Sequence, residues 1–356
     1  MRDGLPRLFY GLGLTLMVGW VLLIGRPIIL PVVASVVVAY VVLGLAELIG
    51  RAPGFGMVPA ALRYALAVAL SLGAMGFIVW LIVQNISQVS ALVPRYQDQF
   101  LALIQRGAVA AGLDNEPSWQ SLRRDIVGQL NLHRVILTSV VSVASIVGTF
   151  AVILVYAGFI LSEQKAFANK IARLSDEPAK TSQIQQVIRD VNSRIGTYLV
   201  MKTLINLTLG IASYVILRLY GIELAGFWAL LIGLFNYIPY LGGILGVALP
   251  TMLALVQFGE IWPVVMFVLV MCIPQVALGN FIEPWLMGNS LNLSPFIILV
   301  SLVAWASIWG IAGAILSVPI MAILVIVFNE FESTRAVAIL LSKDGTIASS
   351  PTASAV

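Results

Sequence analysis

The stretch AGFWALLIGLFNYIPYLGGILGVALPTMLALV, residues 225–256, decides how the rest of the sequence is interpreted. It runs for 32 residues without a charge. A straight helix of that length would exceed a hydrocarbon core of about 30 Å by roughly half. Prolines and glycines, which break helices or let backbones approach closely, interrupt it. They are Pro239, Gly242, Gly243, Gly246 and Pro250. The pattern predicts a broken membrane helix, which is tolerated where protein or a wet cavity covers the freed backbone groups.

A second overlong stretch, residues 296–328, has the same character. It is 33 residues long, carries no charge and contains WGIAGAILSVP, with Gly310, Gly313 and Pro319. A pair of apolar segments interrupted by glycine and proline is the best sequence pointer to a transporter's binding site. The alternative is a tight crossing of helices through small residues, with the prolines as harmless kinks.

Composition places the whole chain in a membrane. Of its 356 residues 60% are hydrophobic and only 10% are charged, whereas a soluble domain carries about 25% charged residues. These values exclude an ordinary globular enzyme. Apolar runs of membrane-spanning length predict an all-α, polytopic integral membrane protein with about eight transmembrane helices. The runs are 8–25, 27–49, 62–84, 138–161, 197–217, 225–256, 261–282 and 296–328.

Residue counts argue against catalysis and cofactors. A single cysteine, Cys272, excludes an intrachain disulfide, and a single histidine, His133, disfavours a histidine-based metal site or triad. The sequence contains no phosphate-binding loop, HExxH or GxSxG motif. We therefore expect no enzyme activity, no catalytic residues, no cofactor and no metal. The net charge of +4 is mild and does not suggest nucleic acid as a partner.

The basic residues predict the orientation. If the N-terminus is inside and every run crosses once, 13 Lys and Arg lie inside and 7 outside, which favours an N-in, C-in topology. If either overlong run is a re-entrant hairpin, that run does not cross the membrane, and the C-terminus could then lie outside.

Two inserts interrupt one predicted transmembrane domain over residues 1–342. Residues 85–137 read as the third membrane helix continuing into an amphipathic extracytoplasmic insert, with a bend at Pro94. Residues 163–196 read as a cytoplasmic amphipathic connector whose helix starts at Pro178. The small, polar residues 343–356 predict a disordered tail. The first insert either packs on the protein's own helices or the lipid surface, or binds a partner or another copy of the chain. The second is either a plain connector or a gate or coupling arm.

Polar residues near the breaks are candidates for a substrate or ion pathway. Asn236 lies in the first break, and Gln275, Asn280 and Glu283 follow along the chain. A carboxylate near lipid is a functional hypothesis by default, although Glu283 could also be an interfacial group in water.

Two further polar residues share a helix face. Lys202 and Asn206 lie four positions apart in the fifth run. Lys202 either extends to the cytoplasmic interface or holds an anionic group.

Several C-terminal motifs together resemble a known family. FNYIPYLGGILGVALP, Gln275 with NFIEPWLMG, LNLSPF and WGIAGAILSVPI, in this order, look like the autoinducer-2 exporter family of bacterial permeases. The resemblance implies an oligomeric inner-membrane transporter. Many members have an acidic residue three positions after the glutamine, where this chain has Leu278. If that acid contributes to ion coupling in the family, its absence argues against the same coupling in this chain. The resemblance also places family motif positions at Asn236, Pro239, Gly242, Gly243, Gln275, Glu283, Pro284, Gly310, Gly313 and Pro319.

Three functions follow as hypotheses. The first is a secondary transporter that exports a small polar molecule resembling autoinducer-2, with proton or sodium coupling through Glu283. The second is a sodium–proton antiporter, which the scarcity of carboxylates in the apolar runs disfavours. The third is a membrane scaffold that transports nothing. The expected partners are the lipid bilayer, a small-molecule or ion substrate and further copies of the chain.

Overall fold

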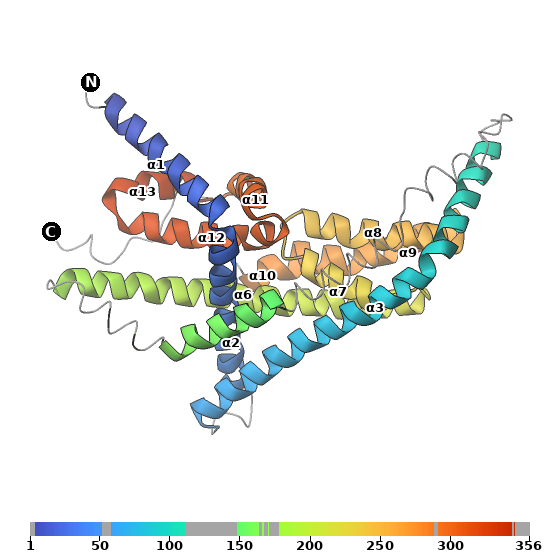
Figure 1. Ribbon diagram of the computed structural model, residues 1–356, viewed down its shortest axis with the longest axis horizontal. Helices are drawn as coiled ribbons and strands as arrows, with labels where there is room; N and C mark the ends of the chain where they lie inside the picture. The colour runs from blue at the N-terminus through green and yellow to red at the C-terminus, as the bar shows by residue number, and fades with distance from the viewer. Residues whose placement is uncertain are drawn as a thin grey trace. The chain divides into compact units, whose positions relative to one another are not determined.

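The protein is known from a computed structural model, which describes residues 4–51, 58–110, 148–163, 178–287 and 291–343, with positions 166, 170 and 345. Within these ranges every regular element is helical, and a single isolated bridge joins Leu293 and Ser342 (Figure 1). The prediction of an all-α membrane protein is confirmed. Apart from residues 343 and 345, the predicted tail lies outside the described residues, as does the part of the 85–137 insert beyond residue 110.

Six helices among the described residues are long and apolar enough to cross a membrane. They fall in six of the eight predicted runs. The other two runs, 8–25 and 138–161, contain shorter apolar helices, Phe9–Ile24 and Gly148–Glu163. The chain is therefore a multi-pass membrane protein, and each predicted run contains a helix.

The chain divides into two compact units. Unit 1 comprises Met1–Val68, Phe150–Thr203 and Met287–Val356, and unit 2 comprises Ala69–Thr149 and Leu204–Leu286. The expectation of a single transmembrane domain over 1–342 stays a prediction.

Unit 1 begins with α1 (Gly4–Ile24) and α2 (Arg26–Arg51), which contact each other. Its C-terminal part is a compact helical set in which α12 packs on α11 and α13. The buried core joins Ile195 and Leu199 to Val318 and Ala322. The C-terminal helices are α11 (Pro295–Trp309), α12 (Ile311–Glu330) and α13 (Glu332–Leu341).

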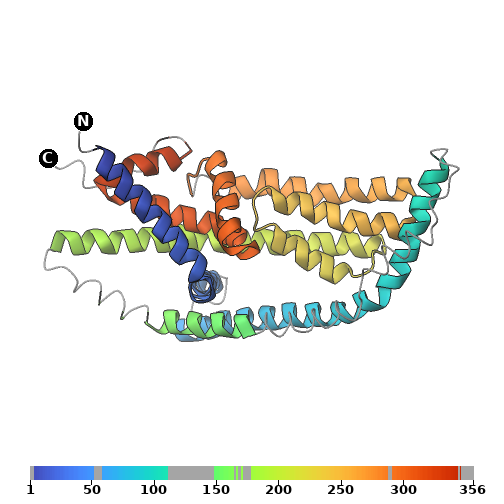
Figure 2. The ribbon, with the colours of Figure 1, turned by 45° about the horizontal axis from the view of Figure 1, so that its top comes forward.

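Unit 2 contains the first broken run and the helices around it. Figure 2 shows α8 and α9 side by side, in agreement with their contacts. A π-helical stretch directly follows α9. The elements are α7 (Ala225–Phe235), α8 (Leu241–Phe258), α9 (Ile261–Val276), η1 (Ala277–Ile282) and α10 (Glu283–Met287).

Two long helices continue beyond their membrane-spanning parts. Helix α3 (Ala60–Ala110) has 51 residues, so the third membrane helix does extend into the 85–137 insert. Helix α6 (Pro178–Leu219) has 42 residues and begins at Pro178, as the sequence predicts. Proline suits the first position of a helix because its missing N–H needs no partner there.

The run 225–256 folds as a helical hairpin. Helix α7 has 11 residues, about 16 Å, which is roughly half of a hydrocarbon core. After the turn, α8 packs back along α7, so that a Cβ atom at Gly246 would lie 3.4 Å from Ile232. A single straight crossing is therefore excluded for this run.

The run 296–328 folds in the same way. Gly310 has φ +66° and ψ −143°, a backbone conformation almost restricted to glycine, and it separates α11 from α12. After this turn Gly313 packs against the carbonyl group of Trp305 on α11. A larger residue at Gly313 would push the two helices of the hairpin apart.

Candidate functional site

A close crossing of α6 and α7 in unit 2 brings the polar residues together. A Cβ atom at Gly210 of α6 would lie 3.3 Å from the carbonyl oxygen of Ala229. One at Gly233 of α7 would lie 3.1 Å from the carbonyl oxygen of Asn206. Small residues allow such backbone approach in membrane helix pairs. The crossing therefore fixes the end of α7 beside Asn206.

Two buried amides meet at this crossing. Asn236 Nδ2, at the C-terminal cap of α7, donates a hydrogen bond of 2.7 Å to Asn206 Oδ1. Asn206 is only 3% exposed, and its Nδ2 has no hydrogen-bond partner among the described residues. A buried donor without a partner costs about 1–3 kcal/mol. This donor is therefore available to an acceptor that the polypeptide does not supply.

Gln275 of α9 adds a third amide, on the face of α8 that carries two of the predicted glycines. A Cβ atom at Gly243 would lie 3.6 Å from Gln275 Oε1, and one at Gly246 would lie 2.8 Å from Gln275 Nε2. Gln275 Nε2 is also buried without a partner in the described part of the chain. The glycines make room for this amide against α8.

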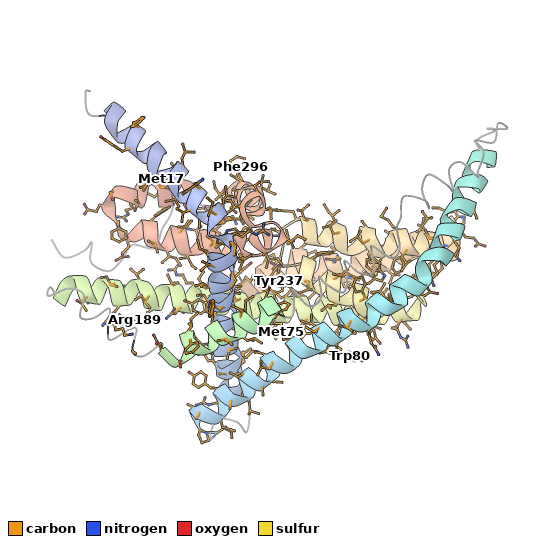
Figure 3. All side chains as sticks on the ribbon, in the orientation of Figure 1. Met17, Met75, Trp80, Arg189, Tyr237 and Phe296 are labelled. Atoms are coloured by element: carbon orange, nitrogen blue, oxygen red, sulfur yellow. The ribbon has the colours of Figure 1, made fainter. Side chains whose placement is uncertain are left out.

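The turn between α7 and α8 is tight and strained. Tyr240 has φ 61° and ψ −45°, and Leu241 N–H donates to Pro239 C=O over 2.6 Å, which closes a γ-turn with positive φ. Gly242 then lies so close to the preceding helix that a Cβ atom there would collide with the Phe235 carbonyl oxygen. Figure 3 labels Tyr237 within this connection. Strained backbone of this kind gathers at ligand sites.

Glu283 and Asn280 lie along the next part of the chain. Between Gln275 and Glu283 the helix widens into the π-helical stretch η1. Pro284 accounts for this, because it lacks an N–H and its ring crowds the carbonyl group one turn earlier. Stretches of π-helix often occur at functional sites. Glu283 is half-buried and has an interaction partner, whereas Asn280 is exposed.

The remaining predicted residues divide between the two units. Pro250 is buried in α8 of unit 2. Lys202 is 5% exposed, has an interaction partner and lies one helical turn before Asn206 on α6. The predicted breaks of the second hairpin, Gly310, Gly313 and Pro319, belong to unit 1. The contacts thus join Asn206 to Asn236 at the α6–α7 crossing, and Gln275 to Gly243 and Gly246 on α8.

The sequence patterns do not identify one residue that holds a loop in place. Gln257, near the end of α8, accepts a hydrogen bond of 3.1 Å from Glu223 N–H and donates one of 2.7 Å to the carbonyl oxygen of Gly221. It thereby holds the loop that leads into α7. Its position two residues before Gly259, at a helix end, is the only sequence signal, and it is a weak one.

The cluster of Asn206, Asn236 and Gln275 presents neutral amides rather than charges. Its unpaired groups are N–H donors, which suit hydroxyl, carbonyl or anionic oxygens. Among the described residues no group of three or more His, Cys, Asp or Glu side chains could hold a metal ion. The chemistry that these three residues offer is therefore recognition of an oxygen-rich polar molecule.

Comparison with known proteins agrees with this organisation. A family model described as AI-2E family transporter matches residues 12–333. The chain belongs to this family. The match covers both hairpins and the residues Asn206, Asn236 and Gln275.

Individual relatives cover different shares of the chain. The "AI-2 transport protein TqsA" of Escherichia coli is 24% identical over 93% of this chain and 96% of its own length. A "Putative transport protein" of Haemophilus influenzae is 28% identical over 72% of the chain and 73% of its own length. A protein of the same name from Borreliella burgdorferi is 32% identical over 184 residues, which are 51% of this chain and 51% of its own length.

Proposed function

We propose that this transporter exports a small, polar, largely uncharged molecule resembling autoinducer-2. The observation that carries the proposal is the Asn206–Asn236 hydrogen bond at the break of a helical hairpin, with unpaired N–H donors on Asn206 and Gln275. Half-helices whose ends meet near the bilayer midplane build binding sites in secondary transporters. E. coli TqsA, the relative that matches nearly the whole chain, is named for AI-2 transport.

The donor chemistry favours a polar solute over a bare cation. An amide N–H repels a cation and binds an oxygen acceptor. A site built to hydrogen-bond its substrate strongly disfavours a ligand without an acceptor, because the buried N–H donors of the site are then left unpaired. This preference ranks export of a polar molecule above sodium–proton antiport. No residue of the chain is assigned a catalytic role.

Coupling to protons or sodium is assigned to Glu283. It is a half-buried carboxylate immediately after the π-helical stretch. A carboxylate in such a place can gain and lose a proton or hold a cation during a transport cycle. The Glu283→Gln variant removes the charge and keeps the shape. We expect it to bind substrate but to lose pH- or sodium-dependent accumulation.

The topology is proposed as N-in and C-in in the inner membrane. If both overlong runs are hairpins that return to the side they entered, the number of membrane crossings falls from eight to six. This number is still even, so both termini remain on the same side of the membrane. Arg335 and Lys343 then stay inside, as the distribution of basic residues requires.

The test is transport by proteoliposomes against a panel of autoinducer-2, other small polar metabolites, sodium and protons. We expect Gln275→Leu to lower transport of the polar substrate about tenfold or more. Thr208→Val is the control, because Thr208 is an exposed polar residue of α6 whose hydroxyl group donates to the Leu204 carbonyl group of its own helix. It should transport like the wild type. Equal loss in both variants would contradict a site at Gln275.

The panel also separates the alternatives. Sodium-dependent proton movement without transport of any metabolite would replace the proposal with an antiporter. No transport by folded protein, together with tolerance of substitutions at Gly242 and Gly246, would favour a scaffold. Size-exclusion profiles establish that each variant is folded.

A further inference from the structure

The helix Ile261–Met287, made of α9, η1 and α10, is long and apolar enough to cross a membrane. Its 27 residues measure about 40 Å at 1.5 Å per residue. A bilayer with both headgroup layers is about 40–45 Å thick. Because this helix carries Gln275 and Glu283, its position in the bilayer decides the depth at which these two polar groups act.

One face of α9 carries a row of exposed apolar side chains. Its members follow one another at steps of four and three positions, which keeps them on a single face of an α-helix. They are Trp262, Met266, Leu269, Ile273 and Val276, with exposed fractions between 47% at Val276 and 72% at Trp262. The buried residues of α9 lie off this row. A continuous apolar row that the protein leaves uncovered fits the hydrocarbon of a membrane.

The row continues through η1 with a step of five positions. Phe281, five positions after Val276, is 70% exposed, and Trp285, four positions further, is 81% exposed. A π-helical turn holds one residue more than an α-helical turn, so a step of five returns to the same face. Steps of four and three from Val276 would instead lead to Asn280 and Glu283. The π-helical stretch thus keeps the row apolar and leaves Glu283 half-buried beside it.

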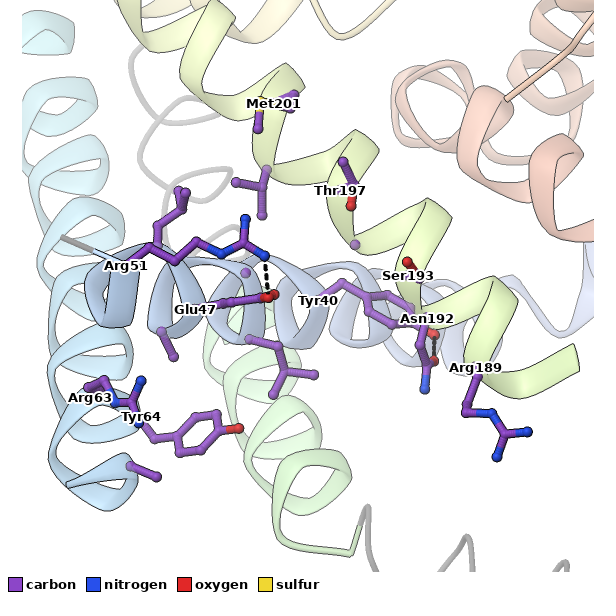
Figure 4. Close-up of a pocket in the computed structure, with 17 residues that line it drawn as sticks. Tyr40, Glu47, Arg51, Arg63, Tyr64, Arg189, Asn192, Ser193, Thr197 and Met201 are labelled. Carbon is purple, nitrogen blue, oxygen red and sulfur yellow. Dashed lines mark hydrogen bonds and ion pairs between the residues drawn. The ribbon is translucent and has the colours of Figure 1, made fainter. Parts of the chain in front are cut away.

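Basic residues gather at the end of α2 in unit 1, whereas this helix has none. Arg51 Nη2 donates to Glu47 Oε1 over 2.6 Å. With Arg63 and Arg189 they line a pocket of about 570 Å³ beside α2, α3 and α6, which Figure 4 shows. Lys and Arg commonly flank membrane segments and help to fix them. Since residues 261–287 contain no Lys or Arg, other side chains must fix their depth.

Tryptophan stands at both ends of the exposed row. Trp262 and Trp285 are 23 positions apart, which is about 34 Å along a helix axis. A helix tilt of about 20° shortens this separation across the membrane by only about 2 Å. Tryptophan favours the layer between hydrocarbon and water, because its ring is apolar and its N–H is polar. These two layers border a hydrocarbon core of about 30 Å, so the spacing fits one tryptophan in each layer.

We propose that this row lies against lipid, with Trp262 and Trp285 anchored in opposite headgroup layers. Gln275, 13 positions from the first and 10 from the second, then lies near the bilayer midplane, the depth at which secondary transporters bind their substrates. Glu283, two positions before Trp285, lies in the headgroup layer on that side, where its carboxylate reaches water. The proposal rests on exposure and spacing and is independent of the transported molecule.

The experiment measures depth with nitroxide labels on the full-length protein in phosphatidylcholine vesicles. Met266→Cys, Ile273→Cys and Phe281→Cys, each in a Cys272→Ser background, leave both tryptophans in place. Glu260→Cys is the control, because it is an exposed residue just beyond the end of the row. Spin resonance gives the collision rates of each label with oxygen, which concentrates in hydrocarbon, and with a nickel chelate, which stays in water.

We expect the ratio of oxygen to nickel collisions to be highest at Ile273, lower and about equal at Met266 and Phe281, and lowest at Glu260. Met266 and Phe281 both lie about 10 Å from Ile273 along the helix, in opposite directions, because the π-helical turn absorbs one residue on the Phe281 side.

Two results would overturn the proposal. A maximum at Met266 or Phe281 would place the midplane elsewhere. Low collision rates with both reagents at all three positions would mean that protein, such as a second copy of the chain, covers the row. The labels report depth whether or not the protein transports a solute, so failure of the proposed function would leave this result unchanged.

Discussion

Asn236 donates a hydrogen bond to Asn206 over 2.7 Å, and this bond joins the tip of the α7–α8 hairpin to the middle of α6. The two residues are 30 positions apart, so the bond is a tertiary contact rather than a helix cap. It lies beside the point where α6 and α7 approach most closely. A change at either amide is therefore transmitted directly to the strained turn at Tyr240.

This bond should be measurable as a coupling energy. We expect the double-mutant cycle of Asn206→Ala and Asn236→Ala to give about 0.6 kcal/mol, the average for polar contacts between membrane helices, and at most about 1.7 kcal/mol. Unfolding of the purified protein in mixed micelles measures it. Additive effects of the two substitutions would mean that the bond contributes nothing to stability.

Two adjacent glycines should respond very differently to the same substitution. Gly242→Ala places a methyl group against the backbone of Phe235 and Asn236, which cannot yield, and should cost about 1–3 kcal/mol. Gly243→Ala meets only Gln275 Oε1 at 3.6 Å, an ordinary contact, and should be nearly neutral. Thermal unfolding compares them. Equal destabilisation would contradict the hairpin geometry.

The second hairpin tip should be sensitive for a different reason. Gly310→Ala forces a residue with a Cβ atom into φ +66°, which should cost about 1–3 kcal/mol. Gly158→Ala serves as the control, because no atom lies within 4 Å of a Cβ atom there. The readout is the unfolding temperature of both variants, and a stable Gly310→Ala protein would exclude this turn.

Gln257 should matter as both a donor and an acceptor. Gln257→Glu keeps an acceptor for Glu223 N–H but places a charge against the Gly221 carbonyl group, so it should lose about 0.5–1.5 kcal/mol. Proteolysis at the 220–224 loop measures the effect locally. Wild-type resistance to the protease would show that the loop is held by other contacts.

The hairpin at 225–256 makes a prediction about sidedness. Single cysteines at Glu223→Cys and Glu260→Cys, in a Cys272→Ser background, flank the hairpin. A membrane-impermeant maleimide should label both from the same side of the membrane in intact cells or inverted vesicles. Labelling from opposite sides would mean that residues 225–256 cross the bilayer.

The sequence predicts the positions of both breaks because proline and glycine act locally. Pro239 and Gly310 disrupt a helix wherever it lies. The pairing of Lys202 with Asn206 on one face follows from the helical period alone. These features need no knowledge of the tertiary fold.

Other features depend on contacts between distant segments, which local patterns do not reveal. Gly242 and Gly243 are equivalent in the sequence, yet only Gly242 meets a backbone. Arg63 and Arg189 lie 126 positions apart and share a pocket only after α2, α3 and α6 pack. From the sequence alone, each of these arginines is simply one of the basic residues that are predicted to lie on the inner face.

The π-helical stretch Ala277–Ile282 acts as an insertion within a helix. One residue more than the α-helical ladder needs is stored there, and each residue rotates the following side chains by about 100° around the helix axis. An extra residue in an uninterrupted α-helix would turn every later side chain by that angle, whereas the wider π-helical turn absorbs it locally. Glu283 therefore keeps the direction that it would have on an ordinary α-helix one residue shorter.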